Sequence, residues 1–282
     1  MDAEPDDQPL FGAVAARLTE LQPDPRRAGA LRARLFDRVQ RSVVAHREYQ
    51  TVRVADRPWQ QLSAGVARRV LRSDARTRVE IQCLAPGATL DLPEDADAQE
   101  ILVLEGALSS PQSTAAPSGV PGARAYGVRQ RMLSDAPVVA LEASTVYLRH
   151  RLGEGAPLPA LEARWWNAAL ASSAWVDPGR RRWHATGEGV EVLSLRGDSE
   201  VVSMLVRFAA GASVPDHRHA LDEDCLVLQG EMFLGDILLR TGDYQLAPAG
   251  GSHFGETSDV GVLFFFHGAL DPVLRGETAP KS

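Results

Sequence analysis

Cysteine is scarce in this sequence of 282 residues, which contains only Cys83 and Cys225. Two cysteines cannot form the disulfide framework of a secreted scaffold, and so low a number is typical of a reducing cytosol. Long hydrophobic runs are also missing: no stretch of 18 apolar residues occurs, so no membrane-spanning helix is expected. The N-terminal sequence MDAEPDDQPL lacks the apolar centre of a secretory signal. We therefore expect a cytoplasmic protein that makes no membrane contact.

Positive charge does not dominate the composition, because the formal net charge is −7 at pH 7. This balance argues against a nucleic-acid footprint spread over the surface, so direct nucleic-acid binding is not expected. The hydrophobic fraction of 44% and the charged fraction of 24% are typical of a folded protein. The length predicts one or two domains.

Residues 1–50 are predicted to form a short α-helical segment. A first helix ends before Pro23, and Asp24-Pro25 is a typical start for a second helix, which ends near His46. Apolar residues mark one face of each helix: Leu10, Val14, Leu18 and Leu21, then Leu31, Leu35, Val39 and Val43. The other face of the second helix is rich in arginine. Such a face is either simply solvated or a docking surface for an acidic or amphipathic partner.

An internal repeat with a constant offset of 124 residues runs through the rest of the chain. The stretch Trp59–Pro93 aligns without a gap on Trp183–His217, and Gly106 aligns on Gly230. Repeats of about 100 residues are typical of duplicated domains rather than of solenoid units. The sequence therefore predicts two similar domains in tandem.

Three histidines and one glutamate lie close together in the second copy. His217 and His219 would project to the same side of a strand, because successive strand residues point to opposite faces. Glu223 opens the next apolar run, and His253 follows a turn-rich segment that can direct its imidazole into the same space. Three imidazoles and one carboxylate favour a divalent ion such as zinc, iron, manganese, nickel or copper over calcium or magnesium.

The same residues carry a resemblance to the cupin superfamily. The sequence matches its paired signature, Gly-x5-His-x-His-x3-Glu-x6-Gly followed by Gly-x5-Pro-x-Gly-x2-His, from Gly211 to His253, with Thr257 where an Asn often follows. The resemblance implies small antiparallel jelly-roll barrels, with His217, His219, Glu223 and His253 as metal ligands inside the second. In the first copy the first three of these ligand positions hold Pro93, Asp95 and Gln99, so a metal-free barrel is expected there.

We therefore predict a mainly β bicupin behind the helical segment at residues 1–50. A metal-free barrel is expected at residues 51–150, a linker at 151–182 and the metal-binding barrel at 183–275. A short amphipathic helix in the linker contains Trp165-Trp166, which we expect to pack into the core.

From Leu31 onward the sequence most resembles the cupin-bearing ChrR-type anti-sigma factors. The resemblance lies in an arginine-rich Leu-x3-Leu helix, then TVRVADRPWQQLSAGV, and DCLVLQGE and GDYQLAPAGGSH in the second copy. It implies a regulatory, stress-sensing protein whose N-terminal helices bind a sigma factor and whose cupin responds to oxidative stress through zinc. Iron, manganese or nickel are the alternative ions. This chain has no cysteine before Cys83, so it lacks the family's N-terminal His-x3-Cys-x2-Cys zinc motif.

Other interpretations stay open at this stage. A three-His, one-Glu cupin is also compatible with a metal-dependent, dioxygenase-type enzyme acting on a small molecule in the second barrel. Asp216, Asp222 and Asp224 flank the ligands and could serve as a base or orient the imidazoles. Cys225 is either a small hydrophobic residue or a redox-sensing thiol. A structural barrel and a homodimer are further options.

Overall fold

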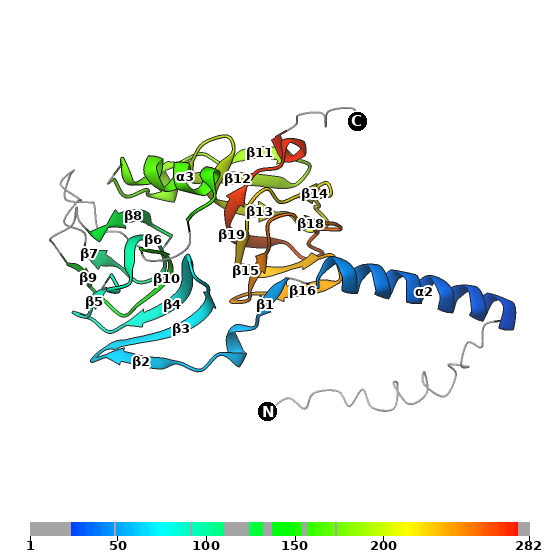
Figure 1. The fold of residues 1–282 in the computed structure, drawn as a ribbon, viewed down its shortest axis with the longest axis horizontal. Coiled ribbons are helices and arrows are strands. Elements are labelled where there is room, and N and C mark those ends of the chain that lie inside the picture. The colour runs from blue at the N-terminus through cyan, green and yellow to red at the C-terminus, as the bar shows by residue number, and fades with distance from the viewer. Residues whose placement is uncertain are drawn as a thin grey trace, which may run out of the picture. The chain divides into compact units, whose positions relative to one another are not determined.

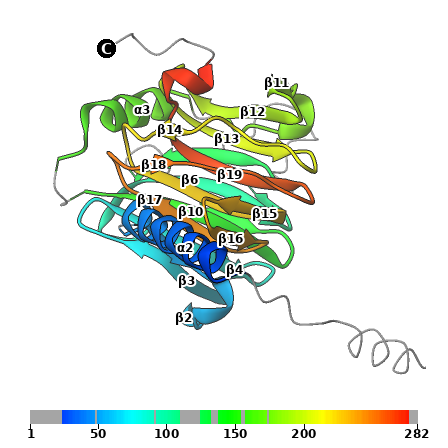
Figure 2. The ribbon, with the colours of Figure 1, turned by 90° about the vertical axis from the view of Figure 1, so that its right-hand side faces the viewer.

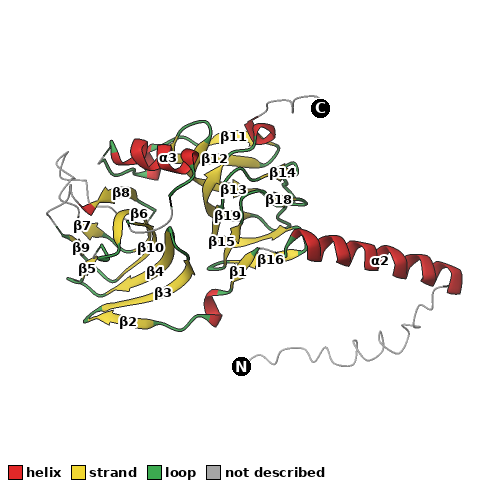
Figure 3. Ribbon diagram, viewed as in Figure 1, coloured by secondary structure: helices red, strands yellow, loops and turns green. Residues whose placement is uncertain are grey.

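The computed structural model describes residues 24–47, 49–90, 92–109, 124–131, 137–153, 157–172 and 174–275. The chain divides into two compact units, Met1–His46 and Arg47–Ser282. The helix predicted over Leu10–Leu21 lies outside the described residues, as does most of the Ser/Pro/Gly-rich loop that follows Gly106 in the first copy. Strands dominate the described residues, as predicted (Figure 3).

The described helix of the first unit is α2 (Pro25–Ala45), which confirms the predicted second helix and its start after Asp24 (Figure 1). Its predicted apolar face consists of Leu31, Leu35, Val39 and Val43, each between 48% and 63% exposed. None of the helices in the described ranges is long and apolar enough to cross a membrane.

In the second unit, the first copy of the repeat forms a barrel from two antiparallel sheets. The larger sheet has the order β2 (Gln60–Ser63), β3 (Val66–Ser73), β4 (Thr77–Leu84), β10 (Ser144–Leu152), β6 (Ala96–Glu105) and β8 (Tyr126–Gln130). The smaller sheet has the order β5 (Thr89–Leu90), β9 (Val138–Ala140) and β7 (Leu108–Ser109). Apolar side chains of both sheets meet in one core, including Val66, Leu90, Ile101 and Val146.

The second copy repeats this plan. Its large sheet has the order β1 (Gln50–Val52), β17 (Tyr244–Ala247), β15 (Glu223–Leu234), β19 (Val262–Ala269), β13 (Val201–Phe208), β12 (Val190–Gly197) and β11 (His184–Gly187), and β16 (Ile237–Arg240) pairs with β15. Strands β13, β19 and β15 lie side by side in Figure 2. The small sheet consists of β14 (His217–Arg218) and β18 (Ser252–His253).

The offset found in the sequence is preserved in the backbone. Adding 124 to the bounds of β2, β3 and β4 gives the bounds of β11, β12 and β13. Gly106 and Gly230 both have positive φ, 81° and 79°, and a Cβ at either position would collide with a backbone carbonyl, 2.5 Å and 2.2 Å away. Only glycine combines that conformation with so close an approach. The two barrels are therefore built on one repeated strand plan.

Strand β1 lies in the sheet of the second barrel although it precedes the first barrel in the chain. Gln50, Thr51 and Val52 pair antiparallel with Leu246, Gln245 and Tyr244 of β17. The second barrel therefore contains an edge strand that lies N-terminal to the whole first barrel in the sequence. The repeat alone did not predict this arrangement.

Helix α3 (Ala160–Leu170) in the linker confirms the predicted helix around the tryptophan pair. Trp165 and Trp166 are each 1% exposed and belong to the same core. The Trp165 ring lies 4.6 Å from the His267 ring of the second barrel, and Arg149 of the first barrel lies 5.5 Å from the Trp166 ring. The prediction of core packing is confirmed, and this core is shared by both barrels.

Buried charges join the two barrels at a second place. Asp224, with no exposed surface, accepts hydrogen bonds from Tyr244 and from Arg149 Nε at 3.1 Å, and it pairs with Arg72 at 3.4 Å. Both arginines come from the first barrel. The position 124 residues before Asp224 is Glu100, which accepts from Tyr126 at 2.7 Å and from Ser203 of the second barrel at 2.5 Å. Each copy thus presents one buried acid to the other.

We predict that Arg149→Met lowers the free energy of unfolding by about 3–5 kcal/mol. The substitution removes the guanidinium that binds the buried carboxylates of Asp224 and Glu162. Removing one partner of a buried ion pair costs far more stability than removing one partner of an exposed pair. Chemical denaturation measures the difference. The matched control is Arg207→Met, because Arg207 pairs with Glu191 on the surface and should change stability little. Equal effects of the two substitutions would contradict the importance of the buried pair.

Candidate metal centre

The small sheet of the second barrel places two of the predicted ligands opposite each other. His217 in β14 pairs with His253 in β18, so the two imidazoles leave neighbouring strands. His219 lies two residues after His217, and the two rings are 5.5 Å apart, which agrees with the predicted common face. Glu223 is the first residue of β15 and approaches from the large sheet.

All four predicted side chains meet in the barrel. One donor atom from each of His217, His219, Glu223 and His253 lies within 4.8 Å of the others. Glu223 Oε2 is 3.4 Å from His219 Nε2 and 3.8 Å from His253 Nδ1. The described residues contain no second group of this kind. A single ion bonded at about 2.0–2.2 Å could bridge these donors after small side-chain movements.

Burial sets the protonation of the cluster. It lowers the pKa of His217, and burial together with the neighbouring His217 lowers the pKa of His219 to about 4. Both imidazoles are therefore neutral near pH 7, the state that binds metals. Burial, followed by the nearby Glu256, raises the pKa of the Glu223 carboxyl well above its usual value.

The donor set fits a metal ion. Glu223 is 2% exposed, and neither of its carboxylate oxygens accepts a hydrogen bond from the described residues. A buried polar group without a partner costs roughly 1–3 kcal/mol, and more when it is charged. A divalent cation bound by the three imidazoles would supply the missing partner and hold the carboxylate ionised.

The surroundings of the ligands differ partly from the prediction. The Nδ1 of His217 donates to the Pro215 carbonyl at 3.0 Å, which leaves Nε2 to face the cluster. Asp222 and Asp224, which the sequence suggested as imidazole partners, instead bind Arg72 of the first barrel. Asp216 accepts from the backbone N–H of Gly255 at 3.0 Å. The backbone carbonyl of Pro215 therefore orients His217, and Asp222 and Asp224 join the barrels.

Glu256 is a further acid at the site that the sequence analysis missed. Its carboxylate lies 3.9 Å from His217 Nε2 and 3.9 Å from His253 Nδ1. Burial raises its pKa to about 8. The available signal was an acid three residues after His253, but the cupin motif directs attention to position 257 instead.

Tyr49 is the second missed residue, and it comes from the segment just before β1. Its ring meets the His253 ring edge-on at 5.4 Å and lies 6.1 Å from the His219 ring. Its hydroxyl donates to the Ser252 carbonyl at 2.6 Å. Because Tyr49 precedes His219 by 170 residues and His253 by 204, no local pattern could reveal the contact.

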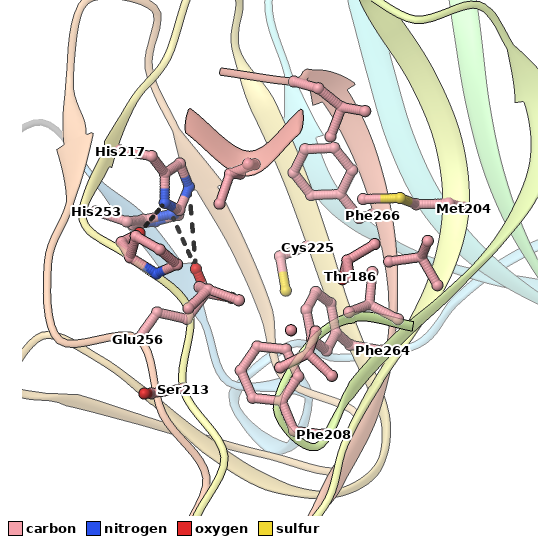
Figure 4. Close-up of a pocket in the computed structure, with 18 of the residues that line it drawn as sticks. Thr186, Met204, Phe208, Ser213, His217, Cys225, His253, Glu256, Phe264 and Phe266 are labelled. Atoms are coloured by element: carbon pink, nitrogen blue, oxygen red, sulfur yellow. Dashed lines mark hydrogen bonds and ion pairs between the residues drawn. The ribbon is translucent and has the colours of Figure 1, made fainter. Parts of the chain in front are cut away.

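A cavity opens from the ligand cluster into the barrel (Figure 4). His217, His253 and Glu256 lie at one end of it, and the aromatic side chains of Phe208, Phe264 and Phe266 lie on the other side. Cys225 lines the space between them. Burial raises the pKa of its thiol well above the usual value, which favours a small hydrophobic residue over a reactive thiolate.

In the first barrel a hydrogen-bond network occupies the corresponding place. Gln99, the counterpart of Glu223, is fully buried, and its Oε1 accepts from Arg129 Nε at 2.7 Å. The Nε2 of Gln99 lies 3.4 Å from His150 Nδ1, and Asp95 pairs with Arg78 at 2.7 Å. A guanidinium thus satisfies the glutamine, and the network has no need of an ion.

Comparison with known families gives one match in two segments. A family model described as the ChrR cupin-like domain matches residues 47–152 and again residues 171–271. Apart from β1, which pairs into the second barrel, the two segments correspond to the two barrels, and together they cover well over half of the chain. No curated protein matches the sequence significantly.

Solved structures with the same fold include a protein from Nostoc punctiforme that is provisionally assigned as a dioxygenase. The TM-score is 0.57 at 15% identity, over 83% of this chain and 88% of that chain. Oxalate decarboxylase from Bacillus subtilis, in its structure at pH 4.6, has a TM-score of 0.54 at 15% identity, over 79% of this chain and 76% of that chain. A mutant of that enzyme has a TM-score of 0.53 at 15% identity, over 79% of this chain and 77% of that chain. At such identity the likeness establishes the fold alone.

We predict that the purified protein carries about one equivalent of a divalent metal and that His219→Ala removes it. The substitution deletes a buried imidazole from the cluster, whereas the matched control His184→Ala changes an exposed imidazole and should retain the metal. Elemental analysis of the purified proteins measures the content. Unchanged metal content in His219→Ala would show that the ion binds elsewhere.

Proposed function

This chain belongs to the ChrR cupin-like domain family, and from that premise we propose that it is a metal-binding regulatory protein of the anti-sigma factor type. His217, His219, Glu223 and His253 hold one divalent ion in the second barrel. Zinc is the first candidate, because three imidazoles and a carboxylate suit it and it has no redox chemistry of its own. The first barrel serves as a scaffold that fixes the second through the buried charges described above.

The contact between Tyr49 and the imidazoles is the observation that carries the regulatory proposal. Tyr49 follows helix α2 by four residues and lies against His219 and His253. Strand β1, which begins at the next residue, is paired with β17 of the same barrel. Any change of the ligand positions therefore reaches the segment that leads from the helical unit. A stress that removes or alters the ion would act on the partner through this segment.

Helix α2 is the proposed partner surface. It combines an exposed apolar row, Leu31, Leu35, Val39 and Val43, with an arginine-rich sequence. Such a helix is suited to lie in an apolar groove with acidic borders. In this proposal the helical segment at residues 1–50, which lacks the N-terminal zinc motif of the family, contacts a group IV sigma factor without a second metal site.

A second candidate function is a metal-dependent enzyme, and Glu256 is the observation that favours it. A buried carboxyl 3.9 Å from two of the proposed ligands is well placed to hold a proton beside a bound substrate. Iron or manganese bound there would supply dioxygen or Lewis-acid chemistry. Manganese centres are characterised in the similar oxalate decarboxylase from Bacillus subtilis.

For the regulatory function, we predict that the protein co-purifies with a group IV sigma factor from its own genome and that Leu35→Asp abolishes the complex. The substitution places a charge in the apolar row of α2, whereas the matched control Asp37→Asn changes the same helix outside that row. Size-exclusion chromatography of the co-expressed pair measures the complex. His219→Ala should also change its stability, because it alters the contact with Tyr49. A complex that tolerates Leu35→Asp would contradict the proposed surface.

For the enzymatic alternative, we predict that Glu256→Gln lowers the turnover of any metal-dependent reaction by about 10²–10⁴-fold, the usual contribution of a positioned acid or base. Oxygen uptake with Fe(II) and β-diketone or aromatic substrates is the measurement. Glu231→Gln is the control, since Glu231 pairs with Arg240 at the surface. Absence of oxygen uptake under all of these conditions would count against a dioxygenase.

A further inference from the structure

We propose that the cavity beside the ligand cluster binds an apolar small molecule that carries one oxygen-donor group at one end. This proposal rests on the proposed ion and adds the chemical class of the ligand. The donor group lies at the His217 end of the cavity, and the hydrocarbon body fills the rest of the barrel. Three features of the cavity support this assignment: a polar end at the ligand cluster, an apolar wall elsewhere, and the absence of basic side chains among the described residues that line it.

The polar end of the cavity is formed by His217, His253 and Glu256 (Figure 4). Glu223 also lines the cavity, and its Oε2 lies 3.8 Å from His253 Nδ1. His219 does not line the cavity, and its ring lies near Tyr49 instead. The ligand cluster is thus open toward the cavity. A carboxylate, enol or alcohol oxygen arriving from the cavity would meet the ion and the carboxyl of Glu256 at the same point.

The remainder of the wall is hydrocarbon. The side chains are buried or partly buried and come from four strands and the segment after β19. They include Val190, Val192, Met204, Val206, Phe208, Cys225, Phe264, Phe266, Leu270 and Leu274. The cavity has a volume of about 180 Å³ and is partly open to solvent. An apolar cavity of about 150 Å³ can stay dry and bind benzene, so a hydrocarbon body in this cavity would displace little ordered water.

The charge of the cavity limits the ligand to one anionic group. No lysine or arginine occurs among the described residues that line it, whereas two acids do. A divalent ion bound by three imidazoles and the Glu223 carboxylate leaves at most one net positive charge, because Glu256 can only reduce it. One carboxylate balances that charge, but a second anionic group would be buried without a cation, which is costly. Oxalate and phosphate esters are therefore poor ligands, although oxalate decarboxylase has a similar fold.

Calorimetric titration of the zinc-loaded, full-length protein with butyrate, hexanoate, octanoate and oxalate tests the proposal. We expect Kd to fall about fourfold for each added methylene, the factor for burying one such group, and oxalate to bind no better than butyrate. Val206→Phe fills the cavity from β13 and should weaken octanoate binding at least about tenfold while the zinc content stays unchanged. Val260→Phe is the matched control, because it adds the same ring at an exposed position.

If Val206→Phe fails to fold, Val192→Phe gives the same test at a less buried place in the wall. Octanoate binding that shows no chain-length dependence, or that Val206→Phe and Val192→Phe leave intact, would overturn the proposal. Zinc content is measured first. Protein that binds no zinc would contradict the proposed function. Titration with 1-octanol would then test the apolar cavity without the ion. Octanol binding that Val206→Phe weakens would support the proposed cavity ligand, whereas no binding, or binding that Val206→Phe leaves intact, would overturn it.

Discussion

The carboxylate of Glu223 imposes the main constraint on this structure. It is 2% exposed, it lies among three imidazoles, and no hydrogen bond from the described residues reaches either oxygen. Burial lowers the pKa of two of these imidazoles, His217 and His219, so both are neutral near pH 7. An anion in such a place is tolerable only beside a cation. The second barrel therefore requires either an ion at this point or a protonated glutamic acid, and the donor set around it is that of a metal site.

The two barrels differ in how they satisfy the buried polar side chain at the equivalent strand position. At the position of Glu223 the first barrel has Gln99, and a guanidinium from Arg129 takes the place of an ion. Asp224, next to Glu223, is held by Arg72 and Arg149 of the first barrel. The barrel without a metal donor set thus fixes the strand that carries the ligand carboxylate, which gives the first barrel a structural role in the function of the second.

Much of the fold and the proposed ligand set followed from local sequence. Helical periodicity predicted α2 and α3, and the 124-residue offset predicted equivalent strands, because a duplicated domain keeps its apolar pattern. The four donors were found because strand alternation and short turns fix their relative directions. Tyr49, strand β1 and the arginines around Asp224 were not predictable, since each depends on contacts between segments far apart in the chain. Glu256 was missed because its role depends on burial, which no spacing reports.

Crystallography with anomalous diffraction at the absorption edge of the bound metal tests the central claim most directly. Our account predicts one strong peak, about 2.0–2.2 Å from His217, His219, Glu223 and His253, and no peak beside Gln99. A peak in the first barrel, or a structure in which these four side chains point apart around a protonated Glu223, would contradict it.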